Sequence, residues 1–225
     1  LGRPLLKGAF LSRPNRFSAM LQVPEGQIAC HLHDPSRLTE LLLPGAEVIF
    51  REATSLDRKT RFDIVAVKKG GYWVVVDSRI PNQVFRSMLE KRVLDYQIIK
   101  QEYAFGNSRI DFLLEKEGEK TLVEVKGCSL CVGGKALFPD APTSRGRRHI
   151  IELEKWNSLG FKSMLFFVVF CPDALSVSPN EVTDPDFSDA LRSAVGKGLR
   201  AEAAKAVFDE ASSSILFSGF LPVFL

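Results

Sequence analysis

Three ionisable residues, Asp111, Glu124 and Lys126, stand within two apolar segments and have the chemistry to act together on a phosphodiester bond. Glu124 and Lys126 are two positions apart, so on a β-strand their side chains share one face. Asp111 precedes a short polar turn, and a hairpin through that turn brings it beside the other two. Two carboxylates in one partly buried site repel each other, and a bound divalent cation relieves that repulsion.

Mg²⁺ or Mn²⁺ suits such a site, because Mg²⁺ takes one or two carboxylates together with waters and phosphate oxygens. Asp111 and Glu124 are therefore the predicted metal ligands. Lys126 is the residue predicted to orient or deprotonate the attacking water, which makes all three residues candidate catalytic groups.

The alternative interpretation of Glu124 and Lys126 is an ion pair on an exposed strand, or a pair of solvated side chains. The neighbours Leu122, Val123 and Val125 favour a central, buried strand instead. A charged face on a buried strand requires an explanation, since burying an unpaired charge is costly. The residues alone leave a functional site and a structural pair about equally supported.

The elements that must position this cluster fall into two regions. Residues 1–80 contain short β-type runs separated by turn residues, which predict a small β-barrel, at 9–11, 17–23, 27–32, 47–50, 62–67 and 72–76. Residues 34–42 are expected to form a capped helical turn that closes one end of this barrel.

Composition changes near residue 80, where we expect a domain boundary, and a mixed α/β pattern follows in 81–225. Helices are predicted at 81–94, 144–160 and 186–195, and strands at 98–105, 109–114, 121–125, 163–170 and 214–225. Ile150, Ile151, Leu153, Trp156 and Leu159 are expected to face the core from the second helix. Propensity alone favours a helix for 199–210, although a strand also fits.

The distribution of charge along the chain bears on the kind of partner that the protein binds. Lys plus Arg number 30 and Asp plus Glu 27, and the excess lies in residues 1–81, with 12 basic and 8 acidic side chains. A basic region beside local acidic sites suits a polyanion-binding module joined to a metal site, although ordinary surface variation gives the same balance. We expect a cytoplasmic protein without a secretory signal or transmembrane segment.

Cys128 and Cys131 form a Cys-x-x-Cys pattern, which is half of a zinc site or a redox pair in some proteins. No second clean pair of Cys or His residues accompanies it, so two thiols in a packed junction are the favoured interpretation.

The spacing of Asp111, Glu124 and Lys126 matches the core of the PD-(D/E)xK nuclease superfamily. More narrowly, the chain resembles the sugar fermentation stimulation protein family, SfsA. Five stretches carry this resemblance in order: Arg13-Pro14-Asn15-Arg16-Phe17, residues 33–45 (HDPSRLTELLLPG), Ser108-Arg109-Ile110-Asp111-Phe112, Val123-Glu124-Val125-Lys126, and residues 138–149 (FPDAPTSRGRRH).

The resemblance implies an α+β protein with an OB-fold-like barrel in 1–80 and a nuclease-like domain with a mixed central sheet in 81–225. It also implies a strand at 199–207 and DNA as the partner, with single or double strands left open and a homodimer possible. The residues that it suggests for DNA binding are Arg13, Arg16, Arg37, Arg109, Arg145, Arg148 and His149.

Two function hypotheses follow from the resemblance. One is a Mg²⁺- or Mn²⁺-dependent phosphodiesterase acting on DNA, and the other is a regulator of sugar (maltose) utilisation genes that binds DNA without cutting it. RNA processing is a weaker third hypothesis. The superfamily often adds an acidic residue from its first helix, and here only Glu90 is available, with Glu102 or Asp140 as substitutes.

Overall fold

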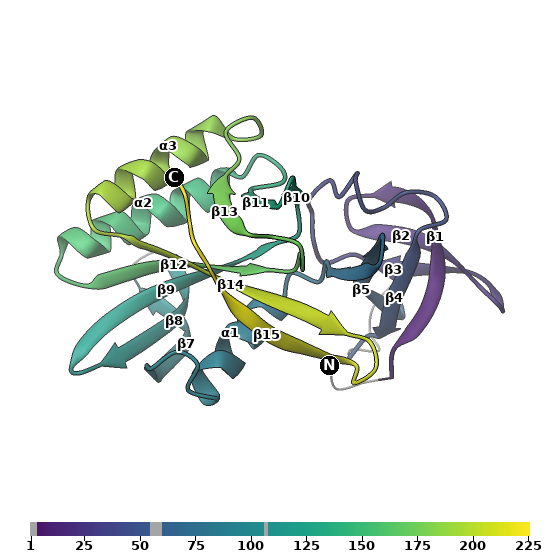
Figure 1. Cartoon of the computed structure of the whole chain (residues 1–225), viewed down its shortest axis with the longest axis horizontal. Coiled ribbons are helices and arrows are strands. Elements are labelled where there is room, and N and C mark those ends of the chain that lie inside the picture. The colour runs from purple at the N-terminus through teal and green to yellow at the C-terminus, as the bar shows by residue number, and fades with distance from the viewer. Residues whose placement is uncertain (1–3, 55–59, 106–107) are drawn as a thin grey trace.

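The computed structural model describes residues 4–54, 60–105 and 108–225. A β-barrel formed by the N-terminal part of the chain lies beside a larger sheet that is covered by helices (Figure 1). Among the described residues, none of the helices combines the length and the apolar character needed to cross a membrane.

The barrel has the connectivity of an OB-fold. Its strands run in the order β3-β2-β1-β4-β5-β6, and parallel pairing of β3 with β5 closes five of them into a barrel, with β6 added beside β5. The strand bounds are β1 Leu6–Asn15, β2 Ser18–Val23, β3 Gly26–His31, β4 Glu47–Glu52, β5 Phe62–Lys69 and β6 Tyr72–Val75. The expected barrel is confirmed, and each β-type run of the sequence overlaps one of these strands, although β1 is longer than the expected 9–11.

In residues 34–42 the expected helical turn is confined to residues 38–42, and the residues before it are irregular. The amide groups of Leu41 and Leu42 both donate to the carbonyl of Leu38, which gives a single closed turn. Leu38, the first residue of this turn, has a φ of +51°, in the left-handed region, so the residues before it cannot extend the turn as an α-helix. All three leucines are buried in the core all the same, which explains their helix-like spacing.

The larger sheet has the order β15-β14-β12-β9-β8-β7. Its strands are β7 Gln97–Phe105, β8 Ser108–Lys116, β9 Glu119–Cys128, β12 Lys162–Val169, β14 Arg200–Asp209 and β15 Ser214–Leu221. β12 pairs in parallel with both β9 and β14, while the other pairs are antiparallel, so the sheet is mixed as expected. A smaller sheet, not expected from the sequence, contains β10 Cys131–Val132, β11 Lys135–Phe138 and β13 Ser176–Pro179.

Helices cover both faces of the larger sheet (Figure 1). The helices α2 (Ser144–Ser158) and α3 (Pro185–Gly196) pack on one face, and α1 (Ile80–Glu90) packs on the other. β12 is buried on both sides, with Phe166 in the core shared with α1 and the barrel, and Phe167 in the core shared with α2 and α3. This explains the continuous apolar run in the sequence of β12.

Several expected boundaries and faces were wrong. α1 ends at Glu90 rather than at residue 94, and Arg92 just beyond it has a φ of +55°. Ile151 and Leu159 are exposed, because only one side of α2 meets the sheet. The strand that the family resemblance implied near 199–207 is confirmed as β14, against the helix that propensity favoured, because pairing with both β12 and β15 decides its structure.

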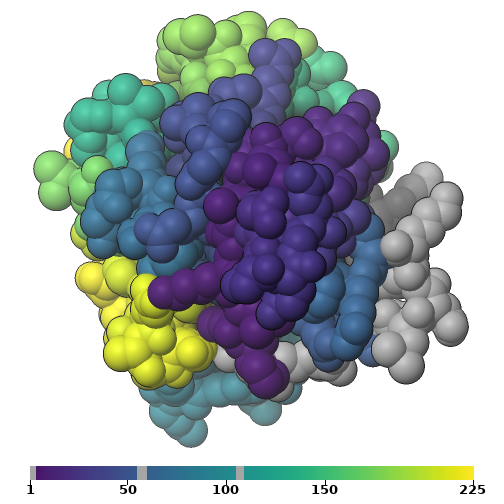
Figure 2. Space-filling view, turned by 90° about the vertical axis from the view of Figure 1, so that its right-hand side faces the viewer, coloured from purple at the N-terminus to yellow at the C-terminus, as the bar shows by residue number. Residues whose placement is uncertain are grey.

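The barrel and the larger sheet share one apolar core, which includes Phe50 from β4, Phe85 from α1 and Phe208 from β14. Polar contacts reinforce the junction: Trp73 Nε1 donates to Glu210 Oε2 at 2.7 Å. Figure 2 shows the C-terminal part of the chain, in yellow, lying directly against the purple barrel. The barrel is therefore packed firmly onto the sheet rather than tethered beside it.

Candidate active site

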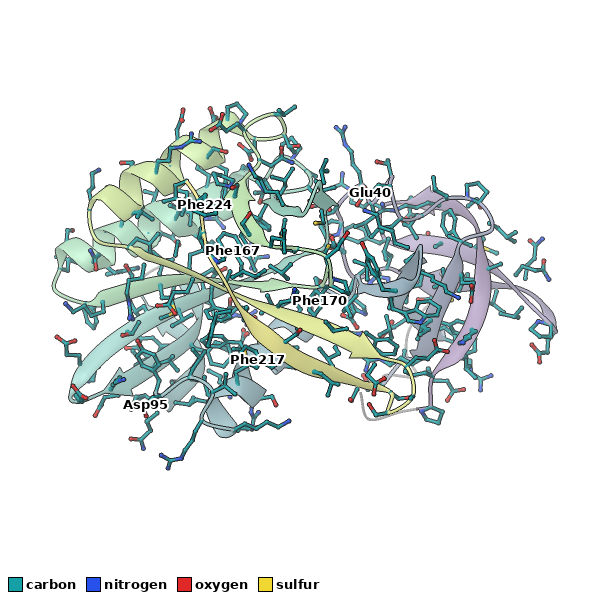
Figure 3. All side chains as sticks on the ribbon, in the orientation of Figure 1. Glu40, Asp95, Phe167, Phe170, Phe217 and Phe224 are labelled. Carbon is teal, nitrogen blue, oxygen red and sulfur yellow. The ribbon has the colours of Figure 1, made fainter. Side chains whose placement is uncertain are left out.

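A cavity of about 340 Å³ opens where the barrel meets the larger sheet, and Asp111, Glu124 and Lys126 all line it. Phe170 also lines this cavity, and Figure 3 places it between the sheet and the barrel. The remaining walls come from the barrel end and from α1 and α2, including Asp34, Ser36, Asp77, Ser78, Asn82, Asp140 and Arg145. The expected hairpin thus brings the three predicted residues into one pocket.

Asp111 reaches the cluster because β8 and β9 stop pairing just before it. Their register runs from Lys116–Glu119 to Phe112–Val123, and beyond this point β9 continues alongside β12. The backbone amide of Val125 donates to Asp111 Oδ2 at 2.8 Å. The Asp111 carboxylate therefore accepts a hydrogen bond from an amide that would otherwise pair with a neighbouring strand.

Glu124 is held from two sides through a single oxygen. Lys126 Nζ donates to Glu124 Oε1 at 2.5 Å, and His149 Nδ1 on α2 contacts the same Oε1. The Glu124 side chain is only 3% exposed, and its other oxygen, Oε2, is buried without a hydrogen-bond partner. A buried carboxylate oxygen left in this state is open to a ligand from the pocket.

The two carboxylates titrate differently. Burial and then the charge of Glu124 raise the pKa of Asp111 to about 6, against the opposing effects of the Val125 amide, Lys126 and Asn82. Burial also pushes up the pKa of Glu124, but Lys126 and His149 outweigh it, so this pKa lies below its ordinary value. At neutral pH the pocket therefore contains two adjacent negative charges.

Asn82, in the first turn of α1, is a site residue that sequence reasoning missed. Its Nδ2 donates to Asp111 Oδ1 at 2.9 Å. The helix approaches β9 closely at this point because Gly127 has no side chain, and a Cβ built there would lie 2.7 Å from Cγ of Pro81. A neutral amide thus occupies the place on the first helix where an acidic residue was sought.

Three further acidic residues, Glu90, Glu102 and Asp140, were candidates for the site, and the structure places one of them in the lining of the pocket. Glu90 is exposed and pairs with Arg86, and Glu102 is exposed and pairs with Arg109, so neither lines the pocket. Asp140 does line it. Burial and then the charge of Asp34 raise the pKa of Asp140 to about 6.

The pocket carries donors for a hard divalent cation. Within the described part of the chain, three His, Cys, Asp or Glu side chains are nowhere arranged to hold a metal together. Mg²⁺ does not need three, because it is commonly held by one or two carboxylates and completes its shell with water and phosphate oxygens. The carboxylates of Asp111 and Glu124, with Glu124 Oε2 unpartnered, fit that requirement.

The basic residues suggested for DNA binding fall into different environments. Arg145 is exposed at the start of α2 and lines the pocket, and Arg148 is exposed one turn further along. His149 is buried against Glu124, and Arg145 Nε donates to its Nε2 at 3.4 Å. His149 therefore supports the carboxylate and does not present its ring to solvent.

In the barrel, Arg13 donates to the backbone carbonyls of Arg16, Asp34 and Arg37, so its guanidinium ties two loops together. Arg16 and Arg37 themselves are exposed. Arg109 is exposed, paired with its neighbour on β7, and does not line the pocket.

All four cysteines are buried and free of disulfides. Cys128 Sγ donates to the carbonyl of Leu137 at 3.3 Å, at the junction of β9 and the small sheet. Cys128 therefore lies as a packed thiol at this junction.

Comparison with known proteins identifies the family of this chain. The N-terminal part, residues 11–76, matches the family model described as the SfsA N-terminal OB domain. Residues 79–212 match the model described as the sugar fermentation stimulation protein RE domain. The chain belongs to the sugar fermentation stimulation protein family, SfsA.

Relatives in the SfsA family match along most of their length. The sugar fermentation stimulation protein homolog of Methanothermobacter thermautotrophicus is 48% identical over 198 residues, which cover 86% of this chain and 82% of the relative. The homolog of Moorella thermoacetica is 43% identical over 218 residues, 94% of each chain. The solved structure of Pyrococcus furiosus SfsA in complex with Ca²⁺ is 30% identical, with a TM-score of 0.92 over 99% of this chain and 96% of that one.

Proposed function

We propose that the chain binds DNA and hydrolyses its phosphodiester bonds in a reaction that depends on Mg²⁺ or Mn²⁺. The observation that carries this proposal is the pairing of the half-buried Asp111 carboxylate with the buried Glu124 carboxylate, which has one oxygen without a partner and a lysine beside it. The Ca²⁺ complex of the Pyrococcus furiosus relative supports a divalent cation in this family.

Asp111 and Glu124 would hold the cation through their carboxylate oxygens. When bound, a divalent cation supplies positive charge that stabilises the negative charge developing on the phosphate during hydrolysis. Asn82 and the Val125 amide fix the orientation of Asp111, and Lys126 and His149 fix that of Glu124. The protein therefore pre-orients both ligands before substrate arrives.

Lys126 would act on the attacking water and on the phosphate of the substrate. One of its three ammonium protons serves Glu124, and its side chain remains 18% exposed in the wall of the pocket. The other protons are available to orient the attacking water and to contact a phosphate oxygen of the substrate.

Phosphates next to the cleaved bond would meet the start of α2. Arg145 lines the pocket there, and Thr143 caps the helix by accepting from the amide of Gly146. The N-terminus of a helix attracts anions, and guanidinium groups bind phosphate oxygens in a paired geometry. We assign Arg145 and Arg148 to contacts with the DNA backbone, which position the strand without reading its sequence.

The test is cleavage of labelled single- and double-stranded DNA by the purified protein with Mg²⁺, with Mn²⁺ and with EDTA. Asp111→Ala and Lys126→Met are expected to lower the cleavage rate at least about a hundredfold. Lys116→Met is the matched control, because Lys116 lies at the far end of the same hairpin and pairs with Asp95 on the surface.

Cleavage that persists unchanged in Asp111→Ala and Lys126→Met would show that the nuclease activity belongs elsewhere, and the proposal would fail. Salt-sensitive DNA binding without cleavage under any divalent metal would replace it with the non-cleaving regulator.

A further inference from the structure

An aromatic surface stands on the outside of the barrel. Phe17, in the turn between β1 and β2, is 46% exposed. Its ring is nearly parallel to that of His31 on β3, with 11° between their planes and 6.3 Å between their centroids. The Arg16 guanidinium lies 5.8 Å from the centre of the Phe17 ring. These three residues, called the barrel platform below, combine flat rings with a positive charge.

The barrel platform is held in place by its backbone. The amide of Phe17 donates to Asn15 Oδ1 at 2.9 Å, and the carbonyl of Phe17 accepts from the amide of Leu32 at 3.0 Å. His31 belongs to β3, where it pairs with Ser18 of β2. A surface fixed in this way loses little conformational freedom when a ligand binds to it.

A chain of contacts leads from the platform to the pocket. The His31 ring meets His33 edge-on, with 4.3 Å between their centroids. The carbonyl of His33 accepts from Ser78 Oγ at 3.0 Å, and Ser78 lines the same cavity as Asp111 and Glu124. His33 and Ser78 therefore connect the platform to the lining of the pocket.

We infer that the substrate is single-stranded DNA, whose unpaired bases stack on Phe17 and His31 while a phosphate contacts Arg16. The inference rests on the proposed DNA binding and names the substrate form. In a duplex the faces of the bases are hidden in the stack, so contact with an aromatic ring requires an unpaired base. Stacking on aromatic rings beside positive charge is how proteins hold single strands with little sequence preference.

The size of the pocket agrees with this substrate. Its volume of about 340 Å³ is at the lower end of the range for small-molecule sites, enough for roughly one nucleotide. A strand lying on the barrel platform would pass along His33 and Ser78 and enter the pocket as a single chain.

The experiment measures fluorescence anisotropy of a labelled oligothymidine of about twelve nucleotides, the scale of one OB-fold site, and of a duplex of the same length. EDTA is present, so binding is measured without cleavage. The wild type is expected to bind the single strand more tightly, and Phe17→Ala to weaken that binding roughly tenfold or more while leaving duplex binding unchanged. Phe17→Trp should retain the affinity, because it keeps the stacking surface.

Phe220→Ala is the matched control, since Phe220 is 54% exposed on β15, outside the barrel. Equal binding of single strand by the wild type and Phe17→Ala, or preference of the wild type for duplex, would overturn the inference and leave the proposed DNA binding intact. Failure to bind either DNA would overturn both. Because cleavage plays no part in the measurement, a protein that binds single strands but never cuts them would support the platform and contradict only the proposed hydrolysis.

Discussion

His149 contacts Oε1 of Glu124 through Nδ1, although the two residues lie on α2 and β9 and 25 positions apart in the chain. Lys126 contacts the same oxygen. The protein thus binds one oxygen of the Glu124 carboxylate twice and leaves the other, Oε2, buried without a hydrogen-bond partner. The orientation of the Glu124 carboxylate is therefore set both by its own strand, through Lys126, and by α2, through His149.

Replacing His149 tests this support. His149→Phe fills the space without a hydrogen-bonding nitrogen and is expected to weaken Ca²⁺ or Mn²⁺ binding roughly 10- to 100-fold by calorimetry, as for other residues that orient metal ligands. His149→Asn, which restores a donor near Nδ1, should recover most of the affinity. If His149→Phe and His149→Asn bind the metal equally well, at matched melting temperatures, His149 acts by packing and not through its hydrogen bond.

Asn82 is expected to orient Asp111. Asn82→Ala removes the donor to Asp111 Oδ1, so the carboxylate gains rotational freedom and metal affinity should fall roughly tenfold. Gln83→Ala is the control, because Gln83 is the next residue of α1 and is exposed. A loss of metal affinity as large in Gln83→Ala as in Asn82→Ala would point to a general effect on the helix.

Gly127 sets the distance between α1 and β9. In Gly127→Ala the new Cβ would meet Pro81, so the helix must shift, at a cost of about 1–3 kcal/mol in the free energy of unfolding. The shift also carries Asn82 away from Asp111, so metal binding should weaken together with stability. Gly71→Ala, where a Cβ meets nothing within 4 Å, should leave metal binding unchanged. A Gly127→Ala protein with wild-type stability and metal affinity would contradict this account.

Asp140 makes stability depend on pH. Burial and Asp34 raise the pKa of Asp140 from its ordinary value of 3.8 to about 6 in the folded protein, so folding favours the protonated carboxyl. The stability that Asp140 contributes is therefore fully present below about pH 3.8 and is lost as the pH rises through about 6. Asp140→Asn removes this titration. Between about pH 4 and pH 8 the free energy of unfolding should therefore shift in favour of the variant by up to roughly 3 kcal/mol, measured by urea unfolding.

The control for this pH effect is Asp95→Asn, since Asp95 is largely exposed and pairs with Lys116 on the surface. A difference between Asp140→Asn and the wild type that stays constant across the pH range would show that Asp140 does not titrate in this way.

The residue spacing in β9 predicted that Glu124 and Lys126 share one face, and both line the pocket together with Asp111. Apolar residues on both sides of Glu124 required a buried strand, and the two-residue spacing to Lys126 required a shared face. Asn82 could not be found in the same way, because its contact with Asp111 depends on how closely α1 packs over Gly127. Packing distance between elements leaves no periodic signal in a sequence.

The family resemblance suggested His149 for DNA binding, together with Arg145 and Arg148 near the start of the same helix. A different signal was present: Gly146, His149, Ile150 and Leu153 follow helical spacing, and all four are buried on the face of α2 toward the sheet. The assignment of Arg13 to DNA stays a prediction, and the sequence did not reveal that its guanidinium donates to backbone carbonyls of two loops. The division of the chain at residue 80 stays a prediction.

The apolar core that runs from the barrel into the larger sheet means that neither part has a complete interior of its own. A fragment ending near residue 80 would expose Trp73 and its neighbours to water, and the complementary fragment would expose Phe208. Such fragments would associate through these surfaces instead of remaining dispersed. The two parts therefore depend on each other for a complete apolar interior, as the halves of a single domain do.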